Sequence, residues 1–290
     1  MLVDVLIAVL GGDALAAGID VESFRPAVDG LRTVRVDDGL VLPEGGYGAF
    51  VLGSAALAPL VVRSDGGARF GGGLLAGERV VAGVATFRLG GHYSLGRVRL
   101  GGDVPLHVAS WEAVGDGLAL RPPILGDVRL STELRLLDPA NRPVALSLVV
   151  DAYLPTGEPA RFLGVGRASV RSGLAASRDV GPVRLAGELA VRVPAGADLG
   201  AGLASGPVVG YGVAVSGQVH ERGWLIGEIV GEHAFVAPAA RPVEADVAVR
   251  ARIADTLFGT VGGGVGLSRG VGAPLARAFV GLAFAPGSLP

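Results

Sequence analysis

An alternation of apolar and charged side chains recurs along this chain, and residues 242–255 show one repeat of it clearly. Apolar residues occupy every second position there, and most positions between them are charged: Val243, Ala245, Val247, Val249, Ala251 and Ile253 against Glu244, Asp246, Arg250 and Arg252. Successive side chains of a β-strand point to opposite faces. This stretch therefore predicts a strand with one apolar face and one ionic face.

The same pattern recurs in about a dozen segments, joined by short and longer connections in alternation. Short turns fall near residues 92–96, 138–142, 179–181, 221–223 and 255, whereas the connections at 110–125 and 194–206 are long. This arrangement is typical of an outer-membrane barrel, and an even strand count puts both termini at the short-turn, periplasmic end. We predict an all-β, closed antiparallel up-and-down transmembrane β-barrel with strands at residues 46–60, 78–89, 97–108, 126–137, 143–155, 165–178, 182–193, 208–220, 224–235, 242–255, 257–267 and 274–284.

Composition narrows the class of protein further. No run of 18 or more uncharged apolar residues follows the first few positions, which argues against a helical membrane protein. The chain has no cysteine, which excludes disulfides and thiolate metal sites. Its 27 acidic and 25 basic residues leave no net positive charge for binding nucleic acid. A soluble β-sandwich or calycin-like barrel would turn its apolar faces inward, but about a dozen strands enclose a lumen too wide for those faces to fill.

The charged alternate positions are predicted to line the lumen, because an arginine facing lipid near the membrane midplane costs about 2–4 kcal/mol. The candidates, with Arg88 on the same face, are Arg99, Asp103, Arg129, Glu133, Arg135, Asp151, Arg171, Arg184, Glu188, Arg192, Glu228, Glu244, Asp246, Arg250 and Arg252. They have two interpretations. One is a polar pore lining that selects solutes by charge, and the other is cross-strand ion pairing that fills a closed lumen.

The predicted organisation has four parts. Residues 1–16 resemble an export signal, with a short apolar core and small residues at Ala14 and Ala16, or else an ordinary apolar segment. Residues 17–44 are predicted as a periplasmic leader, 45–286 as the barrel and 287–290 as a tail or the start of a linker. Aromatic girdles would use residues near the predicted strand ends: Tyr47, Phe87, Trp224, Phe235, Phe258 and Phe284.

The residue types that carry catalysis are not spaced on the predicted strands as a catalytic or metal site requires. Glu232 and His233 are adjacent on one predicted strand, so they point to opposite faces and do not share a metal. Ser216 and His220 share a face but lie too far apart for the hydrogen bond that a serine nucleophile needs. Residues 262–264 are glycines without a following helix or lysine, which excludes a phosphate loop. We predict a protein that is not an enzyme, with no metal site and no cofactor.

Several short motifs in the middle of the chain carry a family resemblance. They are Gly126-Asp127-Val128-Arg129-Leu130, Leu134-Arg135-Leu136-Leu137-Asp138-Pro139, residues 144–153, Leu154-Pro155-Thr156-Gly157 and Gly164-Val165-Gly166. Over about residues 45–286 the chain resembles the transporter-type barrels of the phenol-degradation MetA family, and also the N-terminal barrels that precede OmpA-like domains in myxobacteria-type Gram-negative bacteria. The resemblance implies an outer-membrane location and uptake of small, rather apolar compounds, and it carries over no catalytic residues.

Two functions fit these observations. The first is a passive channel or transporter for small molecules. The second is a structural, OmpA-like barrel that anchors the envelope and has a plugged, ion-paired lumen. The expected partners are outer-membrane lipid, a small hydrophobic solute and the barrel assembly machinery. Phe284, at the end of the last predicted strand, resembles the aromatic-ended insertion signal that barrels present to this machinery.

Overall fold

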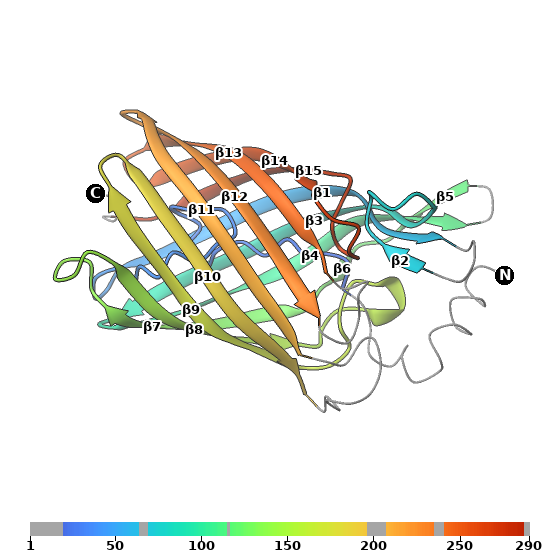
Figure 1. Cartoon of the computed structure of the whole chain (residues 1–290), viewed down its shortest axis with the longest axis horizontal. Helices are drawn as coiled ribbons and strands as arrows, with labels where there is room; N and C mark the ends of the chain where they lie inside the picture. Colours follow the sequence, from blue (N-terminus) through green and yellow to red (C-terminus); the bar gives the residue numbers. More distant parts are fainter. Residues whose placement is uncertain (1–19, 64–68, 115–116, 196–206, 235–240, 287–290) are drawn as a thin grey trace.

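The computed structural model describes residues 20–63, 69–114, 117–195, 207–234 and 241–286. Twelve long antiparallel strands form a closed barrel, because each pairs with the next along the chain and the last pairs with the first (Figure 1). They are β1 (Tyr47–Arg63), β3 (Glu78–Leu95), β4 (Val98–Val114), β7 (Val128–Leu137), β8 (Ala145–Leu154), β9 (Ser169–Val180), β10 (Val183–Pro194), β11 (Val208–His220), β12 (Gly223–Ala234), β13 (Val243–Ala254), β14 (Leu257–Gly266) and β15 (Ala276–Phe284). The predicted fold class is therefore confirmed.

The hairpin between β3 and β4 shows why β3 is longer than predicted. The prediction ended this strand at residue 89, whereas β3 continues to Leu95. Only Gly96 and Arg97 separate it from β4, and Gly96 adopts a φ of +62°, which glycine reaches without steric cost. At the long-loop end, β1 and β4 also pair with the short strands β2 (Arg69–Gly71), β5 (Gly117–Arg121) and β6 (Ile124–Leu125), and the 3-10 turn η1 (Pro159–Arg161) lies between β8 and β9.

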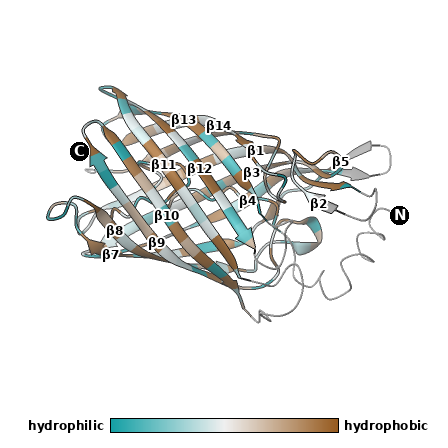
Figure 2. Ribbon diagram, viewed as in Figure 1, coloured by the Kyte–Doolittle hydropathy of each residue, from teal (hydrophilic) through white to brown (hydrophobic). Residues whose placement is uncertain are grey.

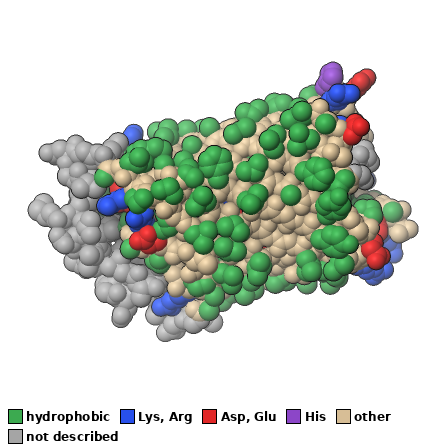
Figure 3. Space-filling view, turned by 180° about the vertical axis from the view of Figure 1, so that it is seen from behind, with side chains coloured by type: hydrophobic (Ala, Val, Ile, Leu, Met, Phe, Trp, Pro, Cys, Tyr) green, Lys and Arg blue, Asp and Glu red, His purple; other side chains and the backbone are tan. Residues whose placement is uncertain are grey.

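The outer face of the barrel is apolar between its two ends. Alternate residues of the long strands are exposed apolar side chains, such as Leu89 with 65% of its surface exposed and Val261 with 59%. Figure 2 shows this alternation along the strands, and Figure 3 shows apolar side chains over the wall with charged ones near the two ends. A closed sheet has no unpaired edge, and its apolar exterior matches hydrocarbon, so this fold places the barrel across an outer membrane. Within the described residues, no helix is long and apolar enough to cross a membrane.

A charge on this outer face is expected to cost more in the middle of a strand than at its end. Leu189 is 61% exposed near the middle of β10, so Leu189→Arg should destabilise the barrel by about 2–4 kcal/mol. Val219 lies beside the β11–β12 turn, and Val219→Arg should cost about 0–1 kcal/mol. Urea unfolding in lipid vesicles, followed by gel mobility, measures both. Equal stabilities of the two variants would contradict a lipid-facing β10.

Residues 20–42, which we call the inner segment, run through the lumen without regular secondary structure, as the blue coil inside the barrel in Figure 1. At the long-loop end, the backbone N–H of Val21 donates to the carbonyl of Phe162 (2.9 Å) and Ser23 Oγ donates to the carbonyl of Gly272 (2.8 Å). At the short-turn end, Leu42 borders a pocket together with Pro139. The inner segment therefore threads the barrel from one mouth to the other before β1 begins.

This path corrects the prediction of a periplasmic leader at residues 17–44. The physical reason is that the barrel wall does not fill its own lumen, so buried apolar and ion-paired residues of the inner segment occupy it. Residues 17–19, the predicted signal at 1–16 and the predicted tail at 287–290 lie outside the described residues.

The predicted aromatic girdles are also corrected in part. Tyr47 and Phe284 are exposed on the outer face at the ends of β1 and β15, as a girdle requires, whereas Phe87 is exposed in the middle of β3. Trp224 and Phe258 lie inside, with their ring centroids 6.4 Å apart, and Phe258 is fully buried. They pack in the same apolar cluster as residues of the inner segment. Phe235 lies outside the described residues.

Candidate functional site: the lumen and its inner segment

The charged residues predicted to face the lumen all lie on the inner face of the wall, and the structure leaves none of these fifteen exposed. Nine are buried: Arg99, Asp103, Arg129, Glu133, Asp151, Glu228, Glu244, Asp246 and Arg250. Six are partly buried: Arg135, Arg171, Arg184, Glu188, Arg192 and Arg252. The alternation of the strands explains this placement, because the neighbouring apolar positions face outward.

A first group of wall charges pairs across neighbouring strands. Asp103 on β4 accepts hydrogen bonds from Arg88 on β3 (2.7 Å) and from Arg129 on β7 (2.5 Å). Arg99 on β4 bonds Glu133 on β7 and also reaches Asp29 of the inner segment (3.1 Å). These groups therefore neutralise one another inside the barrel, and Arg99 joins the wall to the inner segment.

A second group joins the inner segment to β13 and β15. Arg35 donates to Glu244 (2.8 Å) and to Asp246 (3.1 Å) of β13. Arg277 of β15 donates to Glu22 of the inner segment (2.9 Å) and to Glu244 (2.7 Å). The five side chains form a continuous ionic network between the segment and the wall.

Phe24 lies within this network. Its ring centroid is 4.9 Å from the guanidinium carbon of Arg277 and 5.0 Å from that of Arg35. It also packs on the ring of Phe279, at 5.1 Å between centroids. Phe24 is fully buried, so the inner segment is held by packing and by cation–π contacts as well as by ion pairs.

The wall also binds the backbone of the inner segment. Both oxygens of the Glu228 carboxylate accept backbone N–H groups, from Val34 (2.6 Å) and from Arg35 (2.8 Å). Ser147 Oγ donates to the carbonyl of Gly39 (2.7 Å), and Arg129 Nη2 donates to that of Pro26 (2.6 Å). A buried coil needs such partners, because it lacks the regular backbone pairing of a helix or sheet. Within the segment, the N–H of Ala27 donates to the carbonyl of Val34 and that of Gly30 to the carbonyl of Ala27.

At the long-loop mouth the seal is apolar. Val21 of the inner segment is buried in a cluster with Leu60, Val84, Leu163 and Val271, which come from two strands and two loops. The strand β1 bends here: Ala58 adopts a φ of +51°, and the β1–β3 register shifts between Leu57 and Leu60. This bulge turns consecutive residues of β1 inward, so the alternation is lost where the mouth closes.

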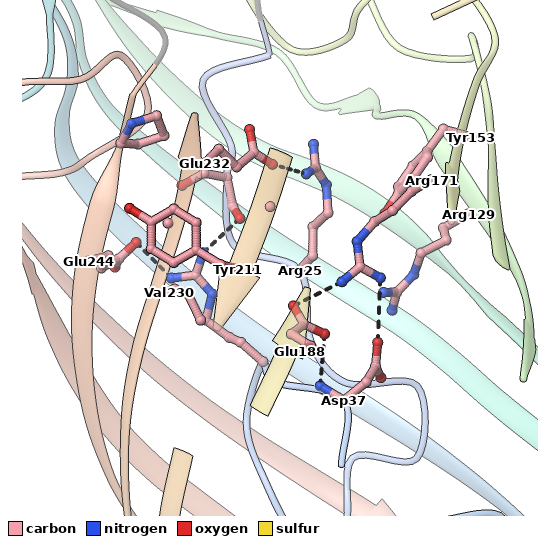
Figure 4. Close-up of a pocket in the computed structure, with 15 residues that line it drawn as sticks. Arg25, Asp37, Arg129, Tyr153, Arg171, Glu188, Tyr211, Val230, Glu232 and Glu244 are labelled. Atoms are coloured by element: carbon pink, nitrogen blue, oxygen red, sulfur yellow. Dashed lines mark hydrogen bonds and ion pairs between the residues drawn. The ribbon is translucent and has the colours of Figure 1, made fainter. Parts of the chain in front are cut away.

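The space left around the inner segment is small in the middle of the barrel and larger at the short-turn end. A central cavity has a volume of about 60 Å³. Figure 4 shows Arg25, Arg171, Glu188 and Glu232 among the residues that line it. Such a volume holds only a few water molecules. Two larger pockets, of about 180 Å³ and about 690 Å³, open at the short-turn end.

Several functional residues were missed by the sequence analysis. Asp29, Arg35 and Glu22 lie in the segment predicted to be outside, and no local pattern marks a coil that threads a barrel. Arg277 had a usable signal, since it alternates with Ala276 and Ala278 on the last predicted strand. It belongs on the ionic face by the same rule that placed the other wall charges.

No family model and no curated protein matches the chain. Among solved structures, it is similar to the COG4313 outer membrane channel from Pseudomonas putida F1, with a TM-score of 0.64 and 16% identity over 87% of this chain and 99% of that one. The NanC porin has a TM-score of 0.53 and 9% identity over 81% and 98% of the two chains. The translocator domain of autotransporter NalP from Neisseria meningitidis has a TM-score of 0.51 and 12% identity, over 85% of this chain and 90% of that one.

The fold is that of an outer-membrane β-barrel. This confirms the outer-membrane barrel that the sequence motifs predict over about residues 45–286. Membership of the phenol-degradation family and the link to OmpA-like proteins stay predictions.

Proposed function

We propose that this protein is a passive outer-membrane channel for small molecules and that its inner segment closes it. The observation that carries the proposal is the content of the lumen. A chain segment without secondary structure runs from mouth to mouth inside a continuous barrel wall. Displacement of this segment would leave a passage as wide as a polypeptide, lined by the charged inner face of the wall.

The comparisons support a channel, because two of the similar folds are named as an outer membrane channel and a porin. The wall charges have both signs, so the open channel is expected to select weakly between cations and anions. We propose no catalytic activity, and in the described part of the chain no three His, Cys, Asp or Glu side chains gather as a metal site. Outer-membrane lipid would contact the apolar outer face, and a small hydrophobic solute remains the proposed cargo.

The alternative is a barrel that serves only as a structural anchor. The ionic network between the inner segment and the wall favours this alternative. Separating the partners of a buried ion pair leaves uncompensated charges, which costs several kcal/mol. The two functions differ in one measurable property. A gated channel conducts when the segment is loosened, whereas an anchor keeps its barrel closed.

Replacing Arg35 by Met tests this difference. The variant removes the bonds from the inner segment to Glu244 and Asp246 but leaves the wall pair of Glu244 with Arg277 intact. In planar bilayers, Arg35→Met should open at least about tenfold more often than the wild type, since loss of one partner of a buried pair costs several kcal/mol. Single-channel recording measures the open probability.

The matched control is Arg121→Met. It breaks the exposed ion pair between Arg121 on β5 and Glu112 on β4, at the long-loop end. It should leave the current unchanged, because exposed pairs contribute about 0–1 kcal/mol. If Arg35→Met folds, as judged by gel mobility, and opens no more often than the wild type, the anchoring function is the better account.

A further inference from the structure

Three of the short motifs in the middle of the chain meet at the long-loop mouth. Asp127 precedes β7, and one oxygen of its carboxylate accepts the backbone N–H of Gly157 (2.9 Å) while the other accepts that of Val165 (2.9 Å). Both donors belong to residues 155–168, which join β8 to β9 and which we call the β8–β9 loop. One carboxylate therefore ties both arms of this loop to the wall.

The residues on either side of Asp127 are themselves fixed. The N–H of Gly126 donates to the carbonyl of Pro105 on β4 (2.9 Å), and Val128 is the first residue of β7. The hydroxyl of Thr156 accepts the N–H of Val128 (3.0 Å) and donates to the carbonyl of Gly126 (2.6 Å). The carboxylate of Asp127 is therefore presented from a rigid part of the barrel.

The β8–β9 loop is a compact unit that closes at a neck. Gly157 and Gly164 touch there, because a Cβ added to Gly164 would lie 2.8 Å from Cα of Gly157. Beyond the neck, the N–H of Leu163 donates to the carbonyl of Glu158 (3.2 Å), with η1 between them. Phe162 adopts a φ of +61°, which is uncommon for a residue with a side chain and persists only where the surroundings fix it.

The tip of the loop covers the mouth of the barrel. Leu163 is fully buried in an apolar cluster with Leu60 of β1 and Val271 of the β14–β15 loop. Because β9 and β15 lie on opposite sides of the ring of twelve strands, the tip reaches across the lumen. The carbonyl of Phe162 also accepts the N–H of Val21 (2.9 Å), at the beginning of the inner segment. The loop therefore lies over the inner segment and binds it.

We propose that the β8–β9 loop is a lid on the long-loop mouth and that the carboxylate of Asp127 is the latch that keeps it shut. The tip lifts only if the arms of the loop move, and this one side chain holds both arms. The inner segment then leaves the lumen at this mouth only after the lid has lifted. This consequence for gating rests on the proposed channel function, whereas the lid and its latch do not.

The test is the rate at which a buried cysteine reacts with a water-soluble maleimide in the full-length protein in a nonionic detergent. The chain has no cysteine, so Leu163→Cys places a single thiol at the buried tip of the lid. Asp127→Ala should raise its labelling rate at least about tenfold, because two hydrogen bonds to a charged acceptor are lost. Asp127→Asn keeps one accepting oxygen and should raise the rate less. If Leu163→Cys does not fold, Val271→Cys, at a position 7% exposed in the same cluster, is the second probe.

Asp138→Ala is the matched control. Asp138 also accepts a backbone N–H, from Ala140 (3.0 Å), but it lies in the β7–β8 turn at the opposite mouth. Its replacement should leave the labelling of Leu163→Cys unchanged. A thiol at Ala214→Cys, on the inner face of β11, should react no faster when Asp127 is replaced, because only the lid moves.

Two results would overturn the proposal. One is an equal labelling rate of the lid cysteine with Asp127 and with a folded Asp127→Ala barrel. The other is an equal acceleration at Ala214→Cys, which would mean that the whole barrel loosens. The assay needs no current, so its failure would leave the channel proposal standing.

Discussion

Replacement of Arg277 by Met is expected to destabilise the folded barrel by about 3–5 kcal/mol. Arg277 has no exposed side-chain surface, and it donates to Glu22 of the inner segment and to Glu244 of β13. Its loss leaves the carboxylate of Glu22 buried without its arginine partner, because the remaining bonds to Glu22 come from a backbone N–H and from the hydroxyl of Thr86. The Met side chain replaces the packing against Phe24 but not the charge.

Urea unfolding in detergent micelles measures this loss. Tryptophan fluorescence is a suitable signal, because Trp224, one of the two tryptophans, packs against the apolar cluster that includes Phe24. The double variant Glu22→Gln with Arg277→Met should recover part of the stability, since it removes the uncompensated charge. If Arg277→Met is as stable as the exposed-pair variant Arg121→Met, the ionic network does not hold the inner segment.

The strands could be predicted because the membrane imposes an alternation on each of them. β11 has the predicted bounds, residues 208–220, since its apolar positions must face lipid and the intervening positions must not. The same rule placed Glu244, Asp246 and Arg250 on the inner face. The same rule also predicts that Trp224 faces inward, because it is four residues from Glu228 on β12 and so shares the face of Glu228.

The contents of the lumen could not be predicted in the same way. Residues 20–42 have no strand or helix period, and many of their side chains are matched to partners that are distant in sequence. Arg35 meets Glu244 and Asp246, and Asp29 meets Arg99, only after the barrel has closed. The sequence therefore does not decide whether the inward-facing wall charges line an open pore or fill a closed lumen. The structure shows a filling in which the inner segment supplies many of the partners.

A disulfide between the inner segment and the wall provides the most direct test of gating. A Cβ added at Gly212 of β11 would lie 2.8 Å from Cγ2 of Val36. The Cβ atoms at these two positions are then at most about 4.3 Å apart, which does not exceed the separation of about 3.5–4.5 Å found in disulfides. The chain has no cysteine of its own, so Val36→Cys with Gly212→Cys introduces a single defined cross-link.

The decisive measurement is the single-channel current of this double-cysteine variant before and after reduction in the same bilayer. The gating account predicts a silent barrel while the disulfide is intact and discrete openings after a thiol reductant is added. The two single-cysteine variants should respond to neither oxidant nor reductant. Openings of undiminished frequency through a fully cross-linked barrel would contradict the claim that the inner segment is the gate.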